Sequence, residues 1–245
     1  MPKTRLDVAL VERGLAETRA AAQRLVMAGL VFSGDKRLDK AGQAIGPDTA
    51  LEVRGQPHPY VSRGGLKLER ALDHFAIPVA GRVALDVGAS TGGFTDCLLQ
   101  RGTARVYAVD VGTNQLAWKL RSDPRVVSME KTNIRDVTRA LIPEPIALIV
   151  CDASFIGLRT ALPAALALAA PGAHLVALIK PQFEVGKGRV GKGGIVREPE
   201  LHEEVCETIS AWLGEQPGWK VLGVTESPIT GADGNKEFLI SARRA

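Results

Sequence analysis

The feature that most constrains the fold of this chain is an apolar run that ends in an acid and leads directly into a glycine-rich turn. The run covers residues 82–87 and includes Asp86, and a helix is expected to follow the turn at residues 94–100. Glycines in such a turn let the backbone bend tightly beside a ligand. A second apolar run, residues 105–110, ends in Asp110, where the acid at the tip of a strand receives a pair of ribose hydroxyls. The pattern predicts buried parallel strands and a site for a sugar-bearing cofactor.

The turn differs from the dinucleotide-binding fingerprint G-x-G-x-x-G in two ways. Ser90 stands where the second glycine would be, and the carboxyl group of Asp86 lies two residues before Gly88. An anionic pyrophosphate gains nothing from that carboxylate, whereas a cationic cofactor with an amino-acid tail does. The sequence therefore predicts S-adenosylmethionine as the cofactor. The alternative is a glycine-rich turn without a ligand in an ordinary α/β protein.

The composition is that of an ordinary globular protein, with 45% hydrophobic and 24% charged residues. The formal net charge of +4 is a weak indication of a polyanionic partner. Three separate cysteines without metal-ligand spacing, and a charged N-terminus without an apolar signal segment, favour a reduced, cytoplasmic location. Prolines and a glycine interrupt the longest apolar stretch, residues 161–179, so no membrane span is predicted. The four histidines are scattered, and no metal site is predicted.

The first 54 residues have a pattern of their own. A short apolar helical face ends before Gly14, Thr18 is placed to cap a second helix at residues 19–28, and strand-like segments follow. This predicts a small α+β domain with two helices packed on a small sheet. Several of its basic residues could face phosphates together, and the candidates for RNA contact are Arg5, Arg19 and Arg24. On charge pattern alone, solvated helix faces are an alternative.

The order of residues in this segment is more specific than its charge. Its most specific motifs are Arg5-Leu-Asp7, Arg13-Gly-Leu-Ala16, Thr18-Arg19 and Gly29. Together they closely resemble the alpha-L RNA-binding module, which implies binding of structured RNA through the second helix and the loop after it. We expect this domain at residues 1–54, a stiff proline-containing linker at residues 55–60, and a second domain at residues 61–245.

From residue 81 onward, strand-like runs alternate with helical patterns, which predicts a parallel sheet covered on both faces. The expected parallel strands cover residues 82–87, 105–110, 126–129, 146–151 and 174–179. Two further runs, residues 219–225 and 237–242, are joined by a turn-rich segment and predict a closing antiparallel pair. The expected fold is therefore α/β, a Rossmann-like sheet of the class I methyltransferase type behind the small N-terminal α+β RNA-binding domain.

Four polar residues stand where this fold would place chemistry: Lys67, Asp152, Lys180 and Glu237. Asp152 and Lys180 follow apolar runs, at the carboxyl ends of strands where open α/β sheets place their ligands. A partly desolvated lysine with Lys67 nearby gives up its proton more readily, and could then accept one from a ribose 2'-hydroxyl. Asp152 and Glu237 would orient the two amino groups. Taken singly, each residue is more often a solvated cap or a surface ion pair.

The set as a whole is more specific than its members. Its motifs are Tyr60-Val-Ser-Arg-Gly-Gly-Leu-Lys67, Asp86-Val-Gly-Ala-Ser-Thr-Gly-Gly-Phe94 and Ile179-Lys-Pro-Gln-Phe-Glu184, with Asp152 and Glu237. They resemble the FtsJ-like ribose 2'-O-methyltransferases and their Lys-Asp-Lys-Glu tetrad. With the alpha-L module in front, the whole chain resembles the TlyA family of ribosomal RNA methyltransferases, whose members are also labelled haemolysins.

This resemblance implies methylation of a cytidine 2'-hydroxyl in ribosomal RNA or in a ribosomal subunit. It implies Lys180 as the catalytic base and Lys67, Asp152 and Glu237 as its electrostatic partners. The cofactor contacts that it implies are Asp86, Gly88, Ser90, Gly92, Phe94 and Asp110.

A glycine-rich loop at residues 186–193 satisfies G-x-x-x-x-G-K, but it lacks the Ser or Thr that a nucleotide-binding loop uses to hold magnesium. Its basic residues favour instead an RNA clamp on a mobile loop near Lys180, with Lys187, Arg189 and Lys192 as contacts. The alternative is a surface loop without a role.

Two other functions are compatible with parts of the sequence. A membrane-active haemolysin would need an apolar span or a strongly amphipathic basic helix, and neither is evident. A ribosome-assembly factor with a vestigial methyltransferase site would not need an intact tetrad. The short termini favour the subgroup that modifies only the large ribosomal subunit, and the sequence does not indicate an oligomeric state.

Overall fold

The computed structural model describes residues 3–54, 58–186, 188–231 and 234–245. The chain divides into two compact units, residues 1–63 and 64–245. Each unit has a hydrophobic core of its own. The boundary lies close to the linker expected at residues 55–60, of which residues 55–57 lie outside the described part of the chain.

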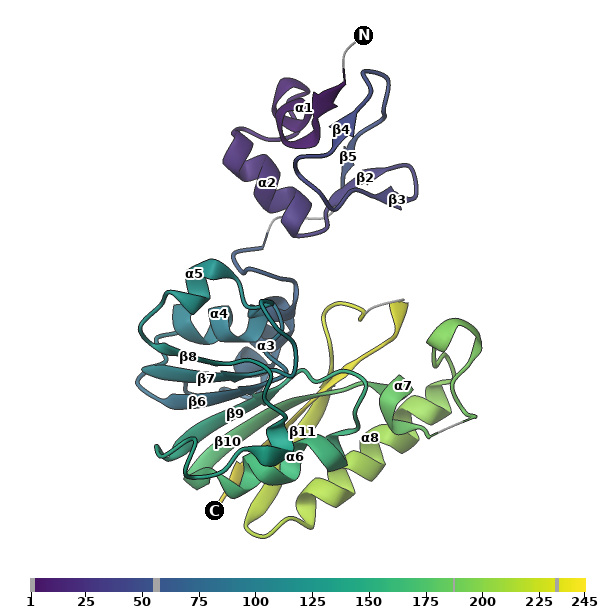
Figure 1. The fold of residues 1–245 in the computed structure, drawn as a ribbon. Helices are drawn as coiled ribbons and strands as arrows, with labels where there is room; N and C mark the ends of the chain where they lie inside the picture. The colour runs from purple at the N-terminus through teal and green to yellow at the C-terminus, as the bar shows by residue number, and fades with distance from the viewer. Residues whose placement is uncertain (1–2, 55–57, 187, 232–233) are drawn as a thin grey trace. The chain divides into compact units, whose positions relative to one another are not determined.

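The N-terminal unit contains two helices and two small antiparallel sheets (Figure 1). The helices are α1 Leu6–Glu12 and α2 Arg19–Met27, and the strands are β1 Thr4–Arg5, β2 Val31–Ser33, β3 Lys36–Arg37, β4 Ala44–Ile45 and β5 Glu52–Val53. β1 pairs with β4, and β2 pairs with β3 and β5. Thr18 caps α2, since its Oγ1 accepts a hydrogen bond from the Ala21 N–H at 3.1 Å. The α+β prediction is confirmed, although β1 and β4 are too short to show an alternation in the sequence.

The second unit is built on a seven-stranded sheet of order β11-β12-β10-β9-β6-β7-β8. The parallel strands are β6 Val83–Val87, β7 Arg105–Val109, β8 Val126–Met129, β9 Ile146–Cys151 and β10 Ala169–Ile179, and the closing strands are β11 Trp219–Glu226 and β12 Phe238–Arg244. β12 runs antiparallel between β10 and β11. The predicted Rossmann-like sheet with its antiparallel ending is confirmed. The order of the strands reverses between β6 and β9, where doubly wound sheets place their ligands.

Strand β10 begins earlier than the sequence predicts, at Ala169. Its pairing with β9 is irregular between Ala169 and His174, where Gly172 has a φ of +73°. Glycine adopts this left-handed conformation without the steric cost that a side chain would add. The proline and glycine that mark a turn in the sequence therefore lie in an irregular entry to the strand.

Helices cover both faces of the sheet (Figure 1). α3 Gly64–His74 and α4 Gly93–Gln100 pack on one face, and α6 Leu158–Ala167 and α8 Pro199–Gly214 pack on the other. The short helices are α5 Trp118–Arg121, η1 Ile134–Asp136, α7 Pro181–Glu184 and η2 Lys192–Gly194. Among the described residues, none of the helices has the length and apolar character needed to span a membrane.

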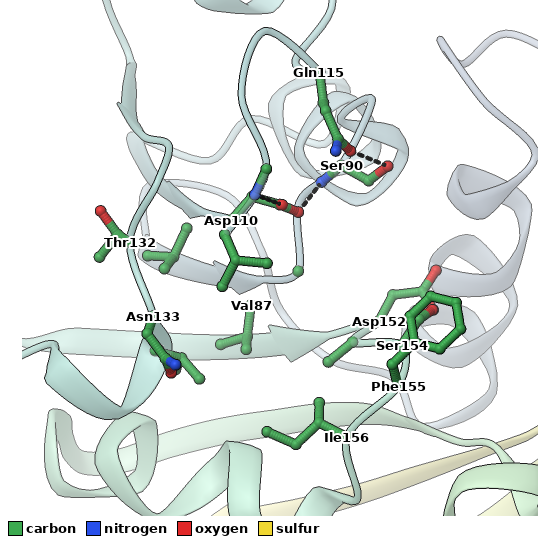
Figure 2. Close-up of a pocket in the computed structure, with 16 residues that line it drawn as sticks. Val87, Ser90, Asp110, Gln115, Thr132, Asn133, Asp152, Ser154, Phe155 and Ile156 are labelled. Atoms are coloured by element: carbon green, nitrogen blue, oxygen red, sulfur yellow. Dashed lines mark hydrogen bonds between the residues drawn. The ribbon is translucent and has the colours of Figure 1, made fainter.

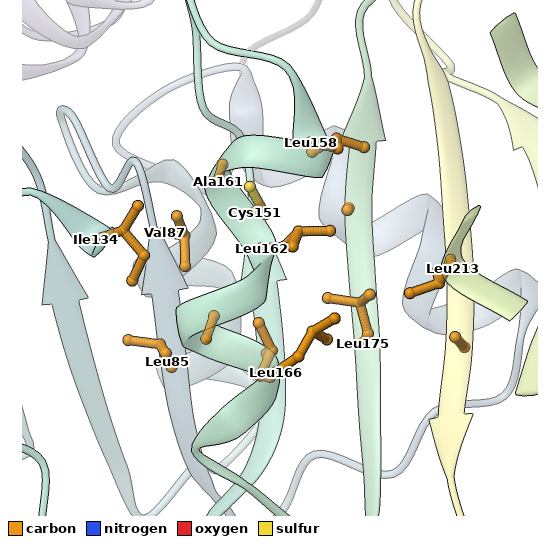
Figure 3. Packing of buried hydrophobic residues seen from close by; sticks show 14 of the residues in the cluster. Leu85, Val87, Ile134, Cys151, Leu158, Ala161, Leu162, Leu166, Leu175 and Leu213 are labelled. Atoms are coloured by element: carbon orange, nitrogen blue, oxygen red, sulfur yellow. The ribbon is translucent and has the colours of Figure 1, made fainter. Parts of the chain in front are cut away.

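Side chains that alternate along the strands separate the two faces. Leu85 and Val87 of β6 belong to the core beneath α6, together with Leu162 (Figure 3). Asp86 lies between them and points to the opposite face, where the hydroxyl of Thr95 on α4 donates to its Oδ2 at 2.7 Å. The alternation that builds the core thus leaves one carboxyl group buried at the end of β6.

We expect Leu162→Ala to lower the free energy of unfolding by about 2–5 kcal/mol, because this fully buried side chain fills the space between α6 and the sheet. Leu141 is 52% exposed, so Leu141→Ala is a matched control that should change stability by less than about 0.5 kcal/mol. Chemical denaturation followed by circular dichroism measures both. Equal effects of the two substitutions would contradict the placement of α6.

Candidate active site

The four polar residues that the sequence singles out as catalytic lie at one edge of the sheet. β9 ends just before Asp152, and the neighbouring parallel strand β10 ends just before Lys180. β12 starts directly after Glu237 and pairs antiparallel with β10, so Glu237 comes to the same edge. Lys67 lies on α3, which packs against β10 and β12. Residues far apart in the sequence are thereby brought to the carboxyl ends of the parallel strands.

Lys67 and Glu237 form a buried ion pair. Lys67 Nζ donates a hydrogen bond to Glu237 Oε2 at 2.5 Å, and the two residues are 8% and 3% exposed. Removing one partner of such a pair leaves the other charge buried without compensation, which is strongly destabilising. The pair therefore fixes the position of α3 relative to the start of β12.

Lys180 is held by a carboxyl group and a hydroxyl group. Its Nζ lies 2.7 Å from Asp152 Oδ1 and donates to Ser154 Oγ at 2.8 Å, while Lys180 is 7% exposed. Lys67 is paired with Glu237 and Lys180 with Asp152, so the tetrad consists of two ion pairs, as expected if the two acids orient the two amino groups. Sequence reasoning missed Ser154, whose only signal is its place shortly after the end of β9.

A cavity of about 600 Å³ opens beside this edge (Figure 2). Its walls come from the ends of β6 and β7 and from the segments that follow β6, β7, β8 and β9. Of the predicted cofactor and catalytic residues, Gly88, Ser90, Asp110 and Asp152 line it. The volume is in the range of small-molecule and cofactor sites.

Asp110 ties the glycine-rich turn to the loop after β7. Its Oδ2 accepts a hydrogen bond from the Ser90 N–H at 2.8 Å, and its Oδ1 accepts one from the Gly112 N–H at 2.7 Å (Figure 2). The hydroxyl of Ser90 in turn donates to Gln115 Oε1 at 3.3 Å. A carboxylate offers about four lone-pair sites, so Asp110 keeps acceptor capacity for the hydroxyls of a ligand in the cavity.

Asp86 is fully buried next to the cavity wall. Thr95 donates to its Oδ2, and no donor in the described residues reaches its Oδ1. Burial, together with the nearby carboxyl groups of Asp152 and Asp110, raises the pKa of Asp86 to about 7, although the hydrogen bond from Thr95 opposes this rise. An unpartnered carboxyl oxygen among other acids favours a cation as its neighbour.

The remaining predicted cofactor residues shape the turn. Gly88 has a φ of +80°, and a Cβ at this position would lie 2.9 Å from the Cα of Ala153. Gly92 has a φ of +97°, and a Cβ there would lie 2.2 Å from Leu120 Cδ1. Phe94 is 3% exposed and packs in the interior. Gly92 and Phe94 are not among the described residues that line the cavity, and a role for them in cofactor binding stays a prediction.

Sequence reasoning missed a large part of the cavity wall. The missed lining residues include Gln115, Thr132, Asn133, Ile134, Ser154, Phe155 and Ile156. The predicted site residues follow β6, β7 and β9. Residues 132–134 follow the parallel strand β8 in the same way. Their place after a strand end was the signal that could have identified them.

Two of the predicted RNA contacts, Arg5 and Arg19, are held by one buried acid. Asp7 accepts hydrogen bonds from Arg5 Nε at 3.0 Å, from Arg19 Nε at 2.9 Å and from Gln23 Nε2 at 2.9 Å. The hydrogen bond from Arg5 holds the pKa of Asp7 far below its usual range. The arginine side chains stay 49% and 56% exposed, and Arg24 is exposed on α2. The sequence analysis did not identify Asp7 as the residue that orients them.

The predicted contacts in the glycine-rich loop have different surroundings. Arg189 donates to both carboxylate oxygens of Glu204 on α8, at 2.6 and 2.5 Å. Lys192 is exposed on η2, whereas Lys187 lies outside the described residues. Part of the loop is held in place, since the Gly191 N–H donates to Ile195 O at 3.1 Å. The structure thus gives part of the loop defined contacts, and the role of the loop as an RNA clamp stays a prediction.

Two families match the chain along consecutive segments. Residues 60–244 match the FtsJ-like methyltransferase family, and residues 4–50 match the S4 domain. The chain belongs to the FtsJ-like methyltransferase family. Its S4 domain is the RNA-binding module that the order of residues in the first segment indicated.

This FtsJ-like methyltransferase is similar to several proteins over nearly its whole length. It is 48% identical to the 16S/23S rRNA (cytidine-2'-O)-methyltransferase TlyA of Mycobacterium tuberculosis, over 98% of this chain and 90% of the relative. It is 42% identical to Hemolysin A of Brachyspira hyodysenteriae, over 96% of this chain and 98% of the relative. It is also similar to a solved structure described as a hemolysin from Streptococcus thermophilus, with 48% identity and a TM-score of 0.77. The match covers 100% of this chain and 90% of the chain in that structure. The predicted resemblance to the TlyA family is confirmed.

S-adenosylmethionine is the cofactor of this family, and the cavity fits it. Asp110 offers acceptor atoms at the tip of β7, where the ribose hydroxyls would bind. Asp86, with its unpartnered oxygen, would balance the positive charge of the amino-acid tail. The carboxyl group of Asp110 contributes to the raised pKa of Asp86, so the two acids lie near each other.

We expect the affinity for S-adenosylmethionine to rise with pH, by at most about tenfold per pH unit, and to level off above about pH 7. Below this pH Asp86 is protonated and neutral, and its proton must leave before the carboxylate can pair with a cation. Calorimetric titrations across this range measure the effect.

Asp86→Asn should weaken binding and flatten the profile, because the amide does not titrate. Asp73→Asn is the matched control, since this acid lies on α3, is exposed and is paired with Arg101. It should leave both the affinity and its pH dependence unchanged. The role of Asp86 is refuted if the substituted and the unsubstituted protein share one profile.

Proposed function

We propose that this protein transfers a methyl group from S-adenosylmethionine to the 2'-hydroxyl of a cytidine in ribosomal RNA. The observation that carries the proposal is the position of Lys180, which contacts two residues of the cavity wall, Asp152 and Ser154. The S4 domain supports RNA as the substrate. The activity named for the Mycobacterium tuberculosis relative supports ribosomal RNA and cytidine.

The chemistry needs a base, because a ribose 2'-hydroxyl is a very weak acid. In its neutral form Lys180 would accept the hydroxyl proton at Nζ as the oxygen bonds to the methyl carbon and the bond from that carbon to the sulfonium sulfur breaks, its electron pair staying on sulfur. When bound, S-adenosylmethionine supplies this methyl group in electrophilic form. Asp152 and Ser154 orient Nζ and stabilise the ammonium group that results. The proton then passes to solvent.

The second ion pair has an electrostatic role. Lys67 carries a positive charge that Glu237 fixes at the same edge of the sheet. Such a charge stabilises the negative charge that develops on the attacking oxygen, and it needs no rearrangement during the reaction. Glu237 at the same time prevents two buried ammonium groups from repelling each other.

RNA docking would be divided between two regions of the chain. We infer domain limits of residues 1–54 and 61–245, with the linker at residues 55–60. Arg5, Arg19 and Arg24 would bind phosphates on the first domain, and Lys187, Arg189 and Lys192 would do so on the second. Phosphate contacts of this kind fix position and orientation rather than sequence. A ribosomal RNA substrate also favours a cytoplasmic location.

We expect Lys180→Ala to lower the rate of methyl transfer to ribosomal RNA by about 10²–10⁴-fold, because the base acts in the chemical step. The dissociation constant of S-adenosylmethionine should stay within about threefold, since the base binds the hydroxyl and not the nucleoside. Lys180→Arg should fail as well, because a guanidinium stays protonated. Single-turnover incorporation of labelled methyl groups, located in the RNA by mass spectrometry, measures the rate and the position.

Lys220→Ala is the matched control, since this lysine is exposed on β11. It should behave as the unsubstituted protein does. Retention of the full rate by Lys180→Ala would show that another group is the base. An unsubstituted protein that binds the cofactor but transfers nothing would instead favour an assembly factor with a vestigial site.

We expect removal of residues 1–58 to leave a folded protein that binds S-adenosylmethionine normally, because the sheet and the cavity belong to the second unit. Methylation of ribosomal RNA at low RNA concentration should nevertheless fall strongly, since a tethered docking domain raises the effective concentration of the RNA at the site. Calorimetry and initial rates over a range of RNA concentrations separate the two effects.

Arg24→Glu should reproduce the loss of RNA affinity and make its salt dependence shallower. Arg24 is preferred to Arg19 for this test, because substitution of Arg19 would also remove a partner of buried Asp7. Lys220→Glu is the charge-matched control in the second unit. An undiminished rate of the truncated protein at low RNA concentration would exclude the S4 domain as the docking element.

A further inference from the structure

Asn235 joins two segments that both lie between Lys180 and Glu237 in the sequence. Its side chain is almost completely buried, at 2% exposure. Asn235 Oδ1 accepts a hydrogen bond from the Val196 N–H at 3.1 Å, and its Nδ2 donates to Gly194 O at 3.0 Å. One amide group thus connects residues 194–196, which directly follow the basic glycine-rich loop and are counted with it below, to the segment that leads into β12.

On the loop side, the bonds of Asn235 are part of a fixed structure. The Nε2 of His202, a buried residue of α8, donates to Val196 O at 2.9 Å, so both backbone polar groups of Val196 are bound. Gly194 N–H donates to Gly191 O at 3.1 Å and closes the turn that carries Lys192. Arg197 follows Val196 directly and is exposed. Two exposed basic residues, Lys192 and Arg197, therefore flank the point at which Asn235 holds the loop.

On the other side, the backbone of Asn235 lies next to Glu237. Asn235 O accepts a hydrogen bond from the Gly231 N–H at 2.9 Å. A Cβ at Gly231 would lie 2.0 Å from Glu237 Oε1, so only glycine fits against this carboxylate. Glu237 is also held by the Ser227 N–H, which donates to its carbonyl oxygen at 2.9 Å. Asn235 thus binds the loop through its side chain, and through its backbone it binds Gly231, which packs against Glu237.

The bonds made by a buried amide favour a single arrangement of the two segments. If the loop moved away, Asn235 and two backbone groups would lose their partners inside the protein, and each unsatisfied group carries a large desolvation cost. An apolar side chain at position 235 would pack there without requiring the loop to take one particular position. The hydrogen bonds of Asn235 therefore make a docked loop and an ordered Glu237 mutually dependent.

We propose that Asn235 is a positioning residue that couples phosphate binding by the loop at Lys192 and Arg197 to the placement of the Lys67–Glu237 ion pair. The inference rests on the proposed function, in which RNA is the substrate. RNA bound at the loop stabilises the docked arrangement, and that arrangement holds Glu237 against Lys67. RNA docking would in this way favour the geometry in which the proton transfer occurs.

The first test of this inference follows hydrogen exchange in the full chain. In Asn235→Ala, the segment that contains Val196 should exchange faster, and so should the segment that contains Ser227, whose N–H bonds to Glu237. Asn235→Asp keeps the acceptor for Val196 but loses the donor to Gly194 O, so it should show a smaller effect and serves if the alanine variant does not fold. Gln216→Ala is the control, because it removes one amide bond, to Trp212 O, at the end of α8.

The second test is a double-mutant cycle between Asn235 and Lys192, read as affinity for ribosomal RNA. Lys192→Gln should weaken binding by about threefold to tenfold in the unsubstituted protein, and by clearly less once Asn235→Ala has released the loop. At saturating RNA, Asn235→Ala should still lower the single-turnover rate of methyl transfer about tenfold, while cofactor affinity stays within about twofold. A residue that only stabilises the fold would not change the cost of Lys192→Gln.

Unchanged exchange near Val196 in both Asn235 variants would overturn the proposal, as would equal costs of Lys192→Gln in the two backgrounds. Faster exchange near Val196 without any change near Ser227 would remove the link to Glu237 and would overturn it as well. If the unsubstituted protein transfers no methyl group to ribosomal RNA, the proposed function fails by itself. The exchange and RNA-affinity measurements then still decide whether Asn235 couples the two segments.

Discussion

Burying a charged group costs free energy unless a partner compensates it, and the proposed chemistry of the second unit depends on where such partners are present. A parallel sheet covered by helices on both faces has room for such groups chiefly at the ends of its strands. Lys67 and Lys180 are each almost fully buried, and each is bound to a carboxyl group. Asp86 is buried too, but one of its oxygens has no partner in the described residues. This edge of the sheet thus holds two lysines that are bound to carboxyl groups and one acid with an unpartnered oxygen. A cation would fit beside the acid, and a reacting hydroxyl group would fit beside Lys180.

The positions along the sheet could be predicted from the sequence because they follow from local patterns. Apolar runs of strand length gave β6, β7 and β9 nearly to the residue, since buried parallel strands are apolar on both faces. Once these strands were placed, Asp110, Asp152 and Lys180 had to lie at their carboxyl ends. The alternation of side chains likewise required Asp86 to face away from the core beneath α6.

The exact contacts of these residues could not be predicted, because they depend on packing across the chain. Lys67 and Glu237 are separated by 170 residues, and nothing local to either indicates which of the two acids binds Lys67. Ser154 and Asn235 contribute single polar atoms whose partners exist only after folding. In the N-terminal unit, Arg5 and Arg19 were identified by charge, but the acid between them was not. Charge pattern gives candidates for binding, whereas orientation requires the packed structure.

The buried carboxyl group of Asp86 makes the stability of the folded chain depend on pH. Its pKa in the folded chain is about 7, above the usual value for an aspartic acid, so the folded state binds a proton more tightly than the unfolded state does. The stability that this group contributes is therefore present at low pH and is lost as the pH rises toward 7. A cation beside Asp86 would offset the free energy needed to ionise the buried carboxyl group, because it attracts the carboxylate. A ligand that binds only the folded state also stabilises that state by mass action. In the proposed role of Asp86, the free energy that its burial costs would be recovered as affinity for S-adenosylmethionine.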